Sequence, residues 1–273
     1  MEYIDPVYEG PTDPTVLRVD DRWLMYYTSR RANVEGLEGV SWVHGTPIGM
    51  AESPDGLQWT YAGDAKIELN GEGLTFWAPE VLVHNGVGHM FLTVVPGIFT
   101  DWDHERSIVH LTSSDLRVWR DPRTLPLATD RVIDACVQQL PDSTWRLWYN
   151  EERFGKNTHY ADSPDLYAWT DRGVATDDQA GEGPNVFWWH DSYWLVTDVW
   201  DGLAVYRSDD ADTWTRQPGT ILAADQKGHH ADIVVDGERA YIYYFVHPDD
   251  RRRSIVRRAE LAVIDGLLTV PAR

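Results

Sequence analysis

Short stretches rich in aromatic and β-branched residues alternate along the chain with turns made of Asp, Asn, Gly and Pro. Stretches of this length and composition predict β-strands, because such side chains fit a pleated, half-buried surface. Many of the strands are joined in pairs by two-residue turns, and Asn85-Gly86 and Asp236-Gly237 are strong hairpin signals. Helical periodicity is weak along the whole chain. The pattern therefore predicts an all-β protein built from hairpins.

The predicted hairpins recur five times. In each one, a shorter strand and a turn precede a longer strand rich in aromatic residues. The longer strands cover residues 23–27, 89–93, 145–149, 193–197 and 240–245. The shorter strands have their first β-branched residue at Val16, Val81, Val137, Val186 and Ile233. Five equivalent hairpins predict five equivalent structural units.

A second pattern, which begins with Ser and Asp and ends with Trp, follows four of the hairpins. Its copies are Ser53–Trp59, Ser114–Trp119, Ser163–Trp169 and Ser208–Trp214. The Trp residues are 60, 50 and 45 positions apart, a period that predicts propeller blades of about four strands. We therefore predict one five-bladed β-propeller over residues 1–273, with these Trp rings packed between blades. The alternative, an all-β sandwich, does not explain the repeat.

The amino-acid composition limits the classes of partner that the protein can bind. The formal net charge of −20 disfavours nucleic acid and anionic membranes, which both require a basic surface. Cys136 is the single cysteine, so no internal disulfide can form. No apolar run reaches membrane-spanning length. Residues 1–6 do not resemble the start of a signal peptide, which predicts a cytoplasmic protein. The oligomeric state stays open.

Chemically active residues stand at the heads of the five short strands, three or four positions before the first β-branched residue. Asp13, Asp134, Glu182 and His230 occupy these positions in four different units. The innermost strand of each propeller blade lines the central channel, so we expect these side chains to meet at one mouth of it. Clustered carboxylates shift each other's pKa, which is costly for folding and useful for catalysis.

These strand heads resemble, blade by blade, the motifs of glycoside hydrolase family 43 and related five-bladed glycosidases. The resemblance extends from about Asp13 to Phe245. It is carried by Asp13-Pro14-Thr15-Val16, Trp77-Ala78-Pro79-Glu80-Val81, Ile133-Asp134-Ala135, Glu182-Gly183-Pro184-Asn185-Val186 and Gly228-His229-His230. Ala78-Pro79-Glu80 departs from the more usual Ala-Pro-Asp. The resemblance implies a glycosidase that inverts the anomeric centre, takes an oligosaccharide or glycoside as substrate and requires no cofactor.

The resemblance also implies individual roles. Asp13 matches the general base that activates water, and Glu182 matches the general acid that protonates the leaving oxygen. Asp134 matches the residue that orients the acid, and as an anion it is expected to favour the protonated acid. His230 matches a histidine near the channel centre, and Trp77 an aromatic wall against the sugar. Inversion requires about 6.5–9.5 Å between acid and base to hold a water.

Other residues are weaker candidates for the same pocket. Trp42, Trp200 and Arg30 lie in or beside predicted loops, where binding groups gather on a rigid scaffold, and Glu80 could reach the pocket from its strand. Glu9 and Asp5 stand in motifs that repeat Glu-Gly-Pro and Asp-Pro, but no blade strand follows either motif directly. Ca²⁺ in the central channel near His230 is an open alternative, although Ca²⁺ prefers oxygen ligands.

Three functions are compatible with the sequence. The first is an exo-acting, inverting hydrolase of short oligosaccharides, with arabinofuranosides, xylosides and related sugars left unseparated. The second is a carbohydrate-binding propeller without catalysis, whose sites would lie between blades. The third is a glycoside phosphorylase, for which Arg30 with Arg31, or Arg153 with Lys156, could form the anion site.

Overall fold

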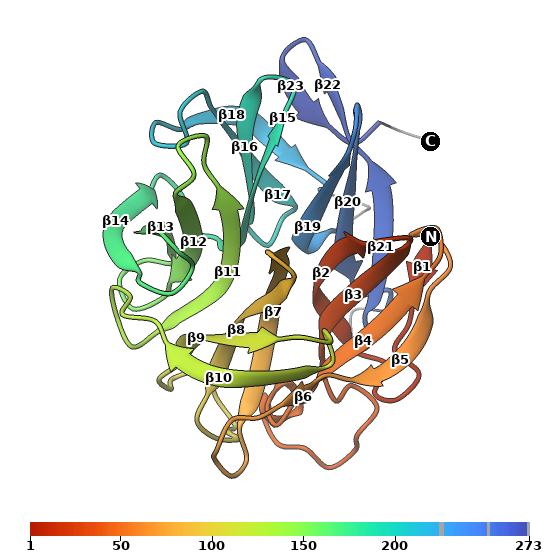
Figure 1. Cartoon of the computed structure of the whole chain (residues 1–273). Coiled ribbons are helices and arrows are strands. Elements are labelled where there is room, and N and C mark those ends of the chain that lie inside the picture. Colours follow the sequence, from red (N-terminus) through yellow and green to blue (C-terminus); the bar gives the residue numbers. More distant parts are fainter. Residues whose placement is uncertain (224–226, 250–251, 272–273) are drawn as a thin grey trace.

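Five small, mainly antiparallel sheets surround a central axis in the computed structural model, which describes residues 1–223, 227–249 and 252–271 (Figure 1). Blade one contains β2 (Pro11–Val19), β3 (Arg22–Ser29), β4 (Ile48–Ser53) and β5 (Thr60–Asp64). Blade two contains β7 (Thr75–His84), β8 (Val87–Val95), β9 (Ser107–Ser113) and β10 (Val118–Thr124), with β6 (Lys66–Ile67) added in parallel to β10. Blade three contains β11 (Val132–Gln139), β12 (Trp145–Glu151), β13 (Asn157–Ser163) and β14 (Thr170–Thr176).

Blade four contains β15 (Glu182–Trp189), β16 (Ser192–Asp198), β17 (Leu203–Ser208) and β18 (Thr215–Ile221). Blade five contains β19 (His229–Asp236), β20 (Arg239–Val246), β21 (Ile255–Glu260) and the N-terminal β1 (Glu2–Tyr3). A short hairpin of β22 (Ala262–Ile264) and β23 (Leu267–Thr269) follows. The prediction of an all-β, five-bladed propeller is confirmed. In the described residues, no helix is long and apolar enough to cross a membrane.

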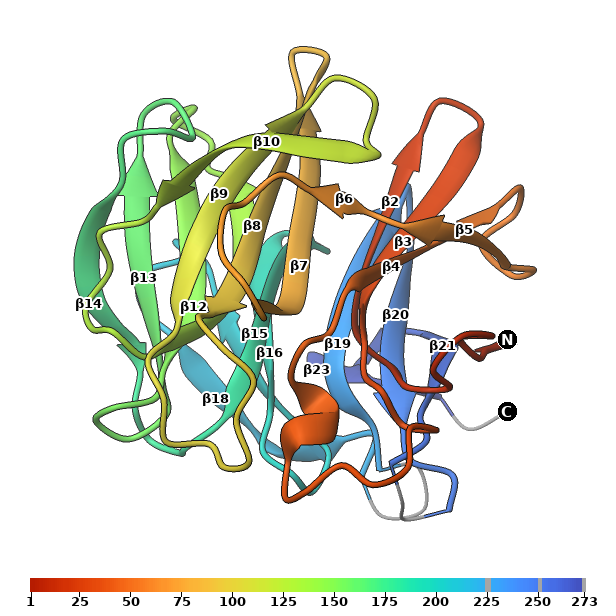
Figure 2. The ribbon, with the colours of Figure 1, turned by 90° about the horizontal axis from the view of Figure 1, so that it is seen from below.

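The first strand of every blade lies nearest the axis. β2, β7, β11, β15 and β19 form a ring in which each strand contacts the next, and β19 returns to β2 (Figure 1). The tight β2–β3 and β7–β8 hairpins lie at one end of the blades. The 3₁₀ turn η1 (Ser41–Val43) and the long connection before β4 lie at the other end (Figure 2). The strand heads identified in the sequence therefore open toward the end that carries the long connection.

The two ends of the chain close the ring together. β1 pairs with β21 through Glu2 opposite Arg257 and Tyr3 opposite Val256, so the outer strand of blade five comes from the N-terminus. The Tyr3 hydroxyl lies 2.9 Å from the Tyr27 hydroxyl of blade one. The strand pattern does not identify β1, because two residues carry no periodicity.

The Ser/Asp/Trp segments are tight turns between the third and fourth strands of blades one to four. In the first copy, Ser53 Oγ accepts the Gly56 N–H at 2.9 Å and Asp55 Oδ1 accepts the Leu57 N–H at 2.8 Å. The prediction needs two corrections. The strand directly before each turn is the third of its blade, and the serine of the second copy is Ser113 rather than Ser114. The capping side chain thus sits two residues before its aspartate in every copy.

The four repeated Trp rings pack between blades, as predicted. Each meets, edge to face, an aromatic ring on the second strand of the preceding blade. The ring pairs and their centroid distances are Trp59–Tyr243 (6.1 Å), Trp119–Tyr26 (5.9 Å), Trp169–Phe91 (5.5 Å) and Trp214–Trp148 (6.4 Å). Trp59 of blade one meets blade five, so this contact also spans the closure of the ring.

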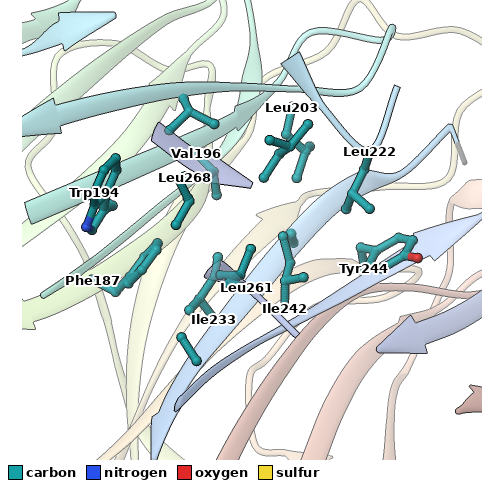
Figure 3. Close-up of a cluster of buried hydrophobic side chains, with 14 of the residues drawn as sticks. Phe187, Trp194, Val196, Leu203, Leu222, Ile233, Ile242, Tyr244, Leu261 and Leu268 are labelled. Atoms are coloured by element: carbon teal, nitrogen blue, oxygen red, sulfur yellow. The ribbon is translucent and has the colours of Figure 1, made fainter. Parts of the chain in front are cut away.

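Apolar side chains fill the spaces between blades. The largest cluster lies between blades four and five, where Phe187 and Trp194 face Ile233 and Ile242 (Figure 3). Leu268 of the β22–β23 hairpin is fully buried in the same cluster. Burial of these surfaces in every gap holds the blades at fixed angles, which is the condition for a rigid site at the axis.

Replacing Trp119 by Ala is expected to lower the free energy of unfolding by about 3–5 kcal/mol, because the fully buried ring would leave a cavity between blades one and two. Urea unfolding followed by circular dichroism measures the change. Trp188→Ala is the matched control, since Trp188 is 48% exposed. A loss below about 1 kcal/mol for Trp119→Ala would contradict the assigned packing role.

Candidate active site

A local irregularity aims the strand heads at the axis. The register of the first strand shifts at its head in every blade, for example between Thr12 and Thr15 and between Ile133 and Cys136. Asp13 and Asp134 there take left-handed backbone conformations, with φ of 51° and 60°. A β-bulge bends a strand and redirects its side chains. The repeated bulge therefore turns both carboxylates toward the channel.

The glycine of Glu182-Gly183 is required by the same bulge. Gly183 has φ of 59°, and a Cβ atom there would lie 2.7 Å from the His230 ring. Its N–H donates to Asp134 Oδ2 at 2.9 Å. Asp134 on blade three is thus bonded to the backbone next to Glu182, which fixes the position of Glu182 on blade four.

A cavity of about 740 Å³ opens at this mouth of the channel. Asp13, Asp134, Glu182 and His230 all line it, although they come from four blades. His230 Nδ1 lies 3.6 Å from Asp13 Oδ1 and 3.8 Å from Asp134 Oδ2, so the histidine stands between two of the carboxylates. The expectation that these residues converge agrees with the structure.

The surroundings affect the ionisation of Asp13 and of His230 through burial and through neighbouring charges. Burial opposes ionisation of Asp13, yet the Arg30 guanidinium at 3.4 Å and His230 hold the pKa of Asp13 below its ordinary value. Burial also opposes the charged form of His230, but Asp134 and Asp13 raise its pKa. Asp13 is consequently an anion over the whole physiological range, and it faces Arg30 and His230.

Asp134 behaves differently from the expected anion. Burial raises the pKa of Asp134 to about 7; His230 opposes this rise, and the negative charges of Glu182 and Asp13 add to it. At neutral pH this carboxyl therefore carries its proton in part of the molecules. Asp134 therefore acts on Glu182 mainly through its hydrogen bond from the Gly183 N–H, and only in part as a negative charge.

An aromatic wall closes one side of the cavity. Trp77 is buried and donates from Nε1 to the Val43 carbonyl at 2.6 Å. Its ring meets the rings of His44 at 5.0 Å and Trp102 at 6.0 Å. Trp102 remains 51% exposed at the rim. Trp77 thus stands where the resemblance implied a wall, and Trp102 extends that wall outward.

Trp200 and Arg30 also line the cavity, whereas four other candidates lie outside it. Trp42 packs beneath the Arg252 guanidinium, 5.6 Å from the ring centroid. Glu9 pairs with Arg253, and Asp5 is buried in a turn where it accepts the Val7 N–H. Glu80 is buried deeper along the axis. The structure therefore keeps Trp42, Glu80, Glu9 and Asp5 out of the cavity lining.

Glu80 belongs to a ring of polar residues that ties the blades together below the cavity. Its Oε1 accepts the Val137 N–H of blade three at 2.9 Å, and its Oε2 accepts from Thr15 of blade one at 3.3 Å. Asp232 of blade five similarly accepts the Val16 N–H at 2.7 Å. Burial, followed by the charge of Asp232, raises the pKa of Glu80 to about 8.

A raised carboxyl pKa in the folded state means that the fold prefers the protonated form. The free energy of unfolding is therefore expected to fall as pH rises from about 4.5 to about 8, the unfolded and folded values for Glu80. Glu80→Gln keeps the shape of the side chain and stays neutral at every pH, so the free energy of unfolding of this variant should fall less with rising pH. Urea unfolding at pH 5 and pH 8 measures the difference. Exposed Glu72→Gln is the control, and equal slopes for all three proteins would contradict the assignment.

The arrangement of the side chains around the channel does not support a calcium site near His230. Among the described residues, no group of three or more His, Cys, Asp or Glu side chains is arranged to hold a metal ion. The oxygens of Asp13 and Asp134 nearest His230 face its ring nitrogen or the Gly183 N–H.

Several lining residues come from positions that the strand-head comparison does not reach. Asp198, Phe245 and Glu152 lie within one residue of the ends of second strands, and Arg106 precedes a third strand. The second strand runs antiparallel to the first, so its end lies beside the first strand's head. Aligning the ends of the second strands, as well as the heads of the first, is the sequence signal that could have identified three of these four residues.

Solved structures share this architecture. A thermostable family-43 glycoside hydrolase superposes with a TM-score of 0.75 at 21% identity, covering 99% of this chain and 96% of that one. An exo-1,5-α-L-arabinanase from a bovine ruminal metagenomic library gives 0.73 at 16% identity, covering 99% of both chains. A family-43 enzyme from Xanthomonas citri complexed with xylotriose gives 0.74 at 15% identity, covering 98% and 92%. No protein-family sequence model and no curated protein sequence matches the chain. The predicted likeness in fold is confirmed.

Proposed function

We propose that this protein is an inverting, exo-acting glycoside hydrolase that cleaves short oligosaccharides. One observation carries the proposal: Asp13, Asp134 and Glu182, from three blades, line one cavity around His230. Clustered carboxylates are costly for folding, so their convergence at one cavity favours a catalytic role. The xylotriose-bound neighbour supports xylosides and related sugars as the first substrates to test.

In the proposed reaction, Asp13 takes a proton from a water molecule while the oxygen of that water attacks the anomeric carbon. The low pKa of Asp13 keeps it available as a base. Glu182 gives its proton to the leaving oxygen as the glycosidic C–O bond breaks. Asp134 holds the Glu182-Gly183 backbone in place, and Trp77 presents its ring to the sugar.

Hydrolysis is favoured over phosphorolysis by the partners of the basic side chains. Arg30 faces Asp13, Lys156 faces Glu152 and Glu182, and Arg131 faces Asp103. Arg153 pairs with Asp130, and neither it nor Arg31 is part of the cavity lining. Of the cations that line the cavity, Arg30, Lys156 and Arg131 are each already paired with a carboxylate, so together they form a poor binding site for phosphate.

The test is hydrolysis of a panel of aryl glycosides and oligosaccharides of xylose, arabinose and galactose, with product anomers followed by proton NMR, with and without phosphate. We expect turnover without phosphate and a first product of inverted anomeric configuration. Turnover that requires phosphate would replace the proposal with a phosphorylase. Sugar binding with no turnover on any member of the panel would replace it with a binding propeller.

A further inference from the structure

A chain of charged side chains leads from the aromatic wall to Glu182. Arg106 is buried against Trp77, and its Nε lies 2.7 Å from Glu152 Oε2. Glu152 Oε1 lies 2.6 Å from Lys156 Nζ, which in turn lies 3.2 Å from Glu182 Oε2. Lys156 is therefore held between two carboxylates, one of them the proposed proton donor.

The backbone fixes Lys156 at this place. Its carbonyl accepts the Gly181 N–H at 2.9 Å, next to Glu182, and the Gly181 carbonyl accepts from the Asn150 side chain. Lys156 itself has φ of 57°, a left-handed conformation that an ordinary residue adopts only when its surroundings require it. The lysine is thus anchored to the strand head that it contacts, which a mobile surface side chain would not be.

Both oxygens of Glu182 have donors. Lys156 holds Oε2, and the Trp200 indole N–H donates to Oε1 at 3.3 Å. The Lys156 ammonium also lies 5.4 Å from the centre of the Trp200 ring. The other charged groups that act on this pair from neighbouring elements are Asp134, His230, Arg106 and Glu152. Among these groups, Lys156 is the cation that contacts the Glu182 carboxyl directly.

We propose that Lys156 is a positioning residue for the proton donor: held by Glu152, it orients the Glu182 carboxyl and favours its ionised form, and so sets the pH above which Glu182 no longer donates. The role of Glu182 as donor rests on the function proposed above. When the Glu182 O–H bond breaks and the proton joins the leaving oxygen, the new carboxylate is paired with Lys156 at once. An opposite charge within about 4–6 Å favours the charged form of a carboxyl.

The first test needs no substrate. The carboxyl carbon of Glu182, observed by ¹³C NMR in glutamate-labelled protein, reports its protonation directly. In Lys156→Met the titration midpoint should rise by about one pH unit. Lys156→Arg, which keeps the charge, should restore most of the difference. Arg153→Met is the matched control, because Arg153 lies in the same loop but pairs with Asp130 outside the cavity lining.

The second test uses two leaving groups. A sugar leaving group needs the proton of Glu182, whereas dinitrophenolate departs without it. For Lys156→Met we expect kcat on the oligosaccharide to fall about tenfold and KM to change little, with the alkaline limb of the pH profile displaced upward. The dinitrophenyl glycoside should be cleaved at nearly the original rate. Thermal unfolding of each variant checks that the fold is intact.

Either of two results would overturn the inference: an unmoved Glu182 midpoint, or equal losses on both leaving groups, which would indicate a merely structural lysine. If the unmodified protein cleaves neither substrate, the proposed hydrolase fails, and the NMR titration still decides whether Lys156 controls Glu182. If Lys156→Met does not fold, Lys156→Arg and Lys156→Gln provide the comparison.

Discussion

Asp13→Asn is expected to reduce hydrolysis by about 10²–10⁴-fold on every substrate, whatever its leaving group. Asparagine has the same shape but cannot take the proton of the attacking water. The loss should be equal for a sugar and for dinitrophenolate, because activation of water is needed in both cases. Steady-state kinetics on the two substrates measures the change.

The Asp13 variant also needs a control for charge removal, since Arg30 and His230 lose their partner. Asp236→Asn serves, because Asp236 pairs with Arg18 in an exposed bridge far from the cavity lining. We expect this control to retain full activity. If Asp13→Asn keeps more than about a tenth of the original rate, Asp13 is not the base, and another carboxylate of the cavity must be examined.

Glu182→Gln is expected to separate the substrates. Hydrolysis of an oligosaccharide should fall by about 10²–10⁴-fold, while cleavage of a dinitrophenyl glycoside should fall less than tenfold, because that leaving group requires no proton. The alkaline limb of the pH profile should disappear along with the titrating carboxyl. Rate measurements from pH 4 to pH 9 on both substrates give the result.

The contrast between these two variants identifies the roles more securely than either loss alone. A variant of the base loses activity on both substrates, whereas a variant of the acid loses activity mainly on the substrate with the poor leaving group. Equal losses in Glu182→Gln would show that Glu182 does not donate the proton. The amide can still accept from Lys156 or from Trp200 but not donate to them, so thermal unfolding should accompany the kinetics.

The cavity depends on closure of the propeller as much as on the catalytic side chains. Asp13 on blade one and His230 on blade five meet only because β19 packs beside β2 and the N-terminal β1 joins blade five. The interblade rings, such as Trp59 against Tyr243, hold the same junction at the outer edge of the blades. Stability and catalysis are therefore linked through the geometry between blades.

By itself, the sequence determines the repeat and hence the blades. Strand composition, hairpin turns and the spacing of Trp119 and its equivalents follow from local rules, which act over a few residues. The same local register places Asp13, Asp134 and Glu182 at strand heads. Since every first strand faces the axis, their convergence could be predicted without coordinates.

Only the tertiary structure decides where the remaining side chains point. The bulge at each strand head redirects neighbouring residues, so Glu80 enters the ring below the cavity instead of the cavity itself. Trp42 turns toward Arg252, and Lys156 reaches Glu182 because Gly181 binds its loop. These positions depend on contacts between segments far apart in the chain, which local propensity and periodicity do not encode.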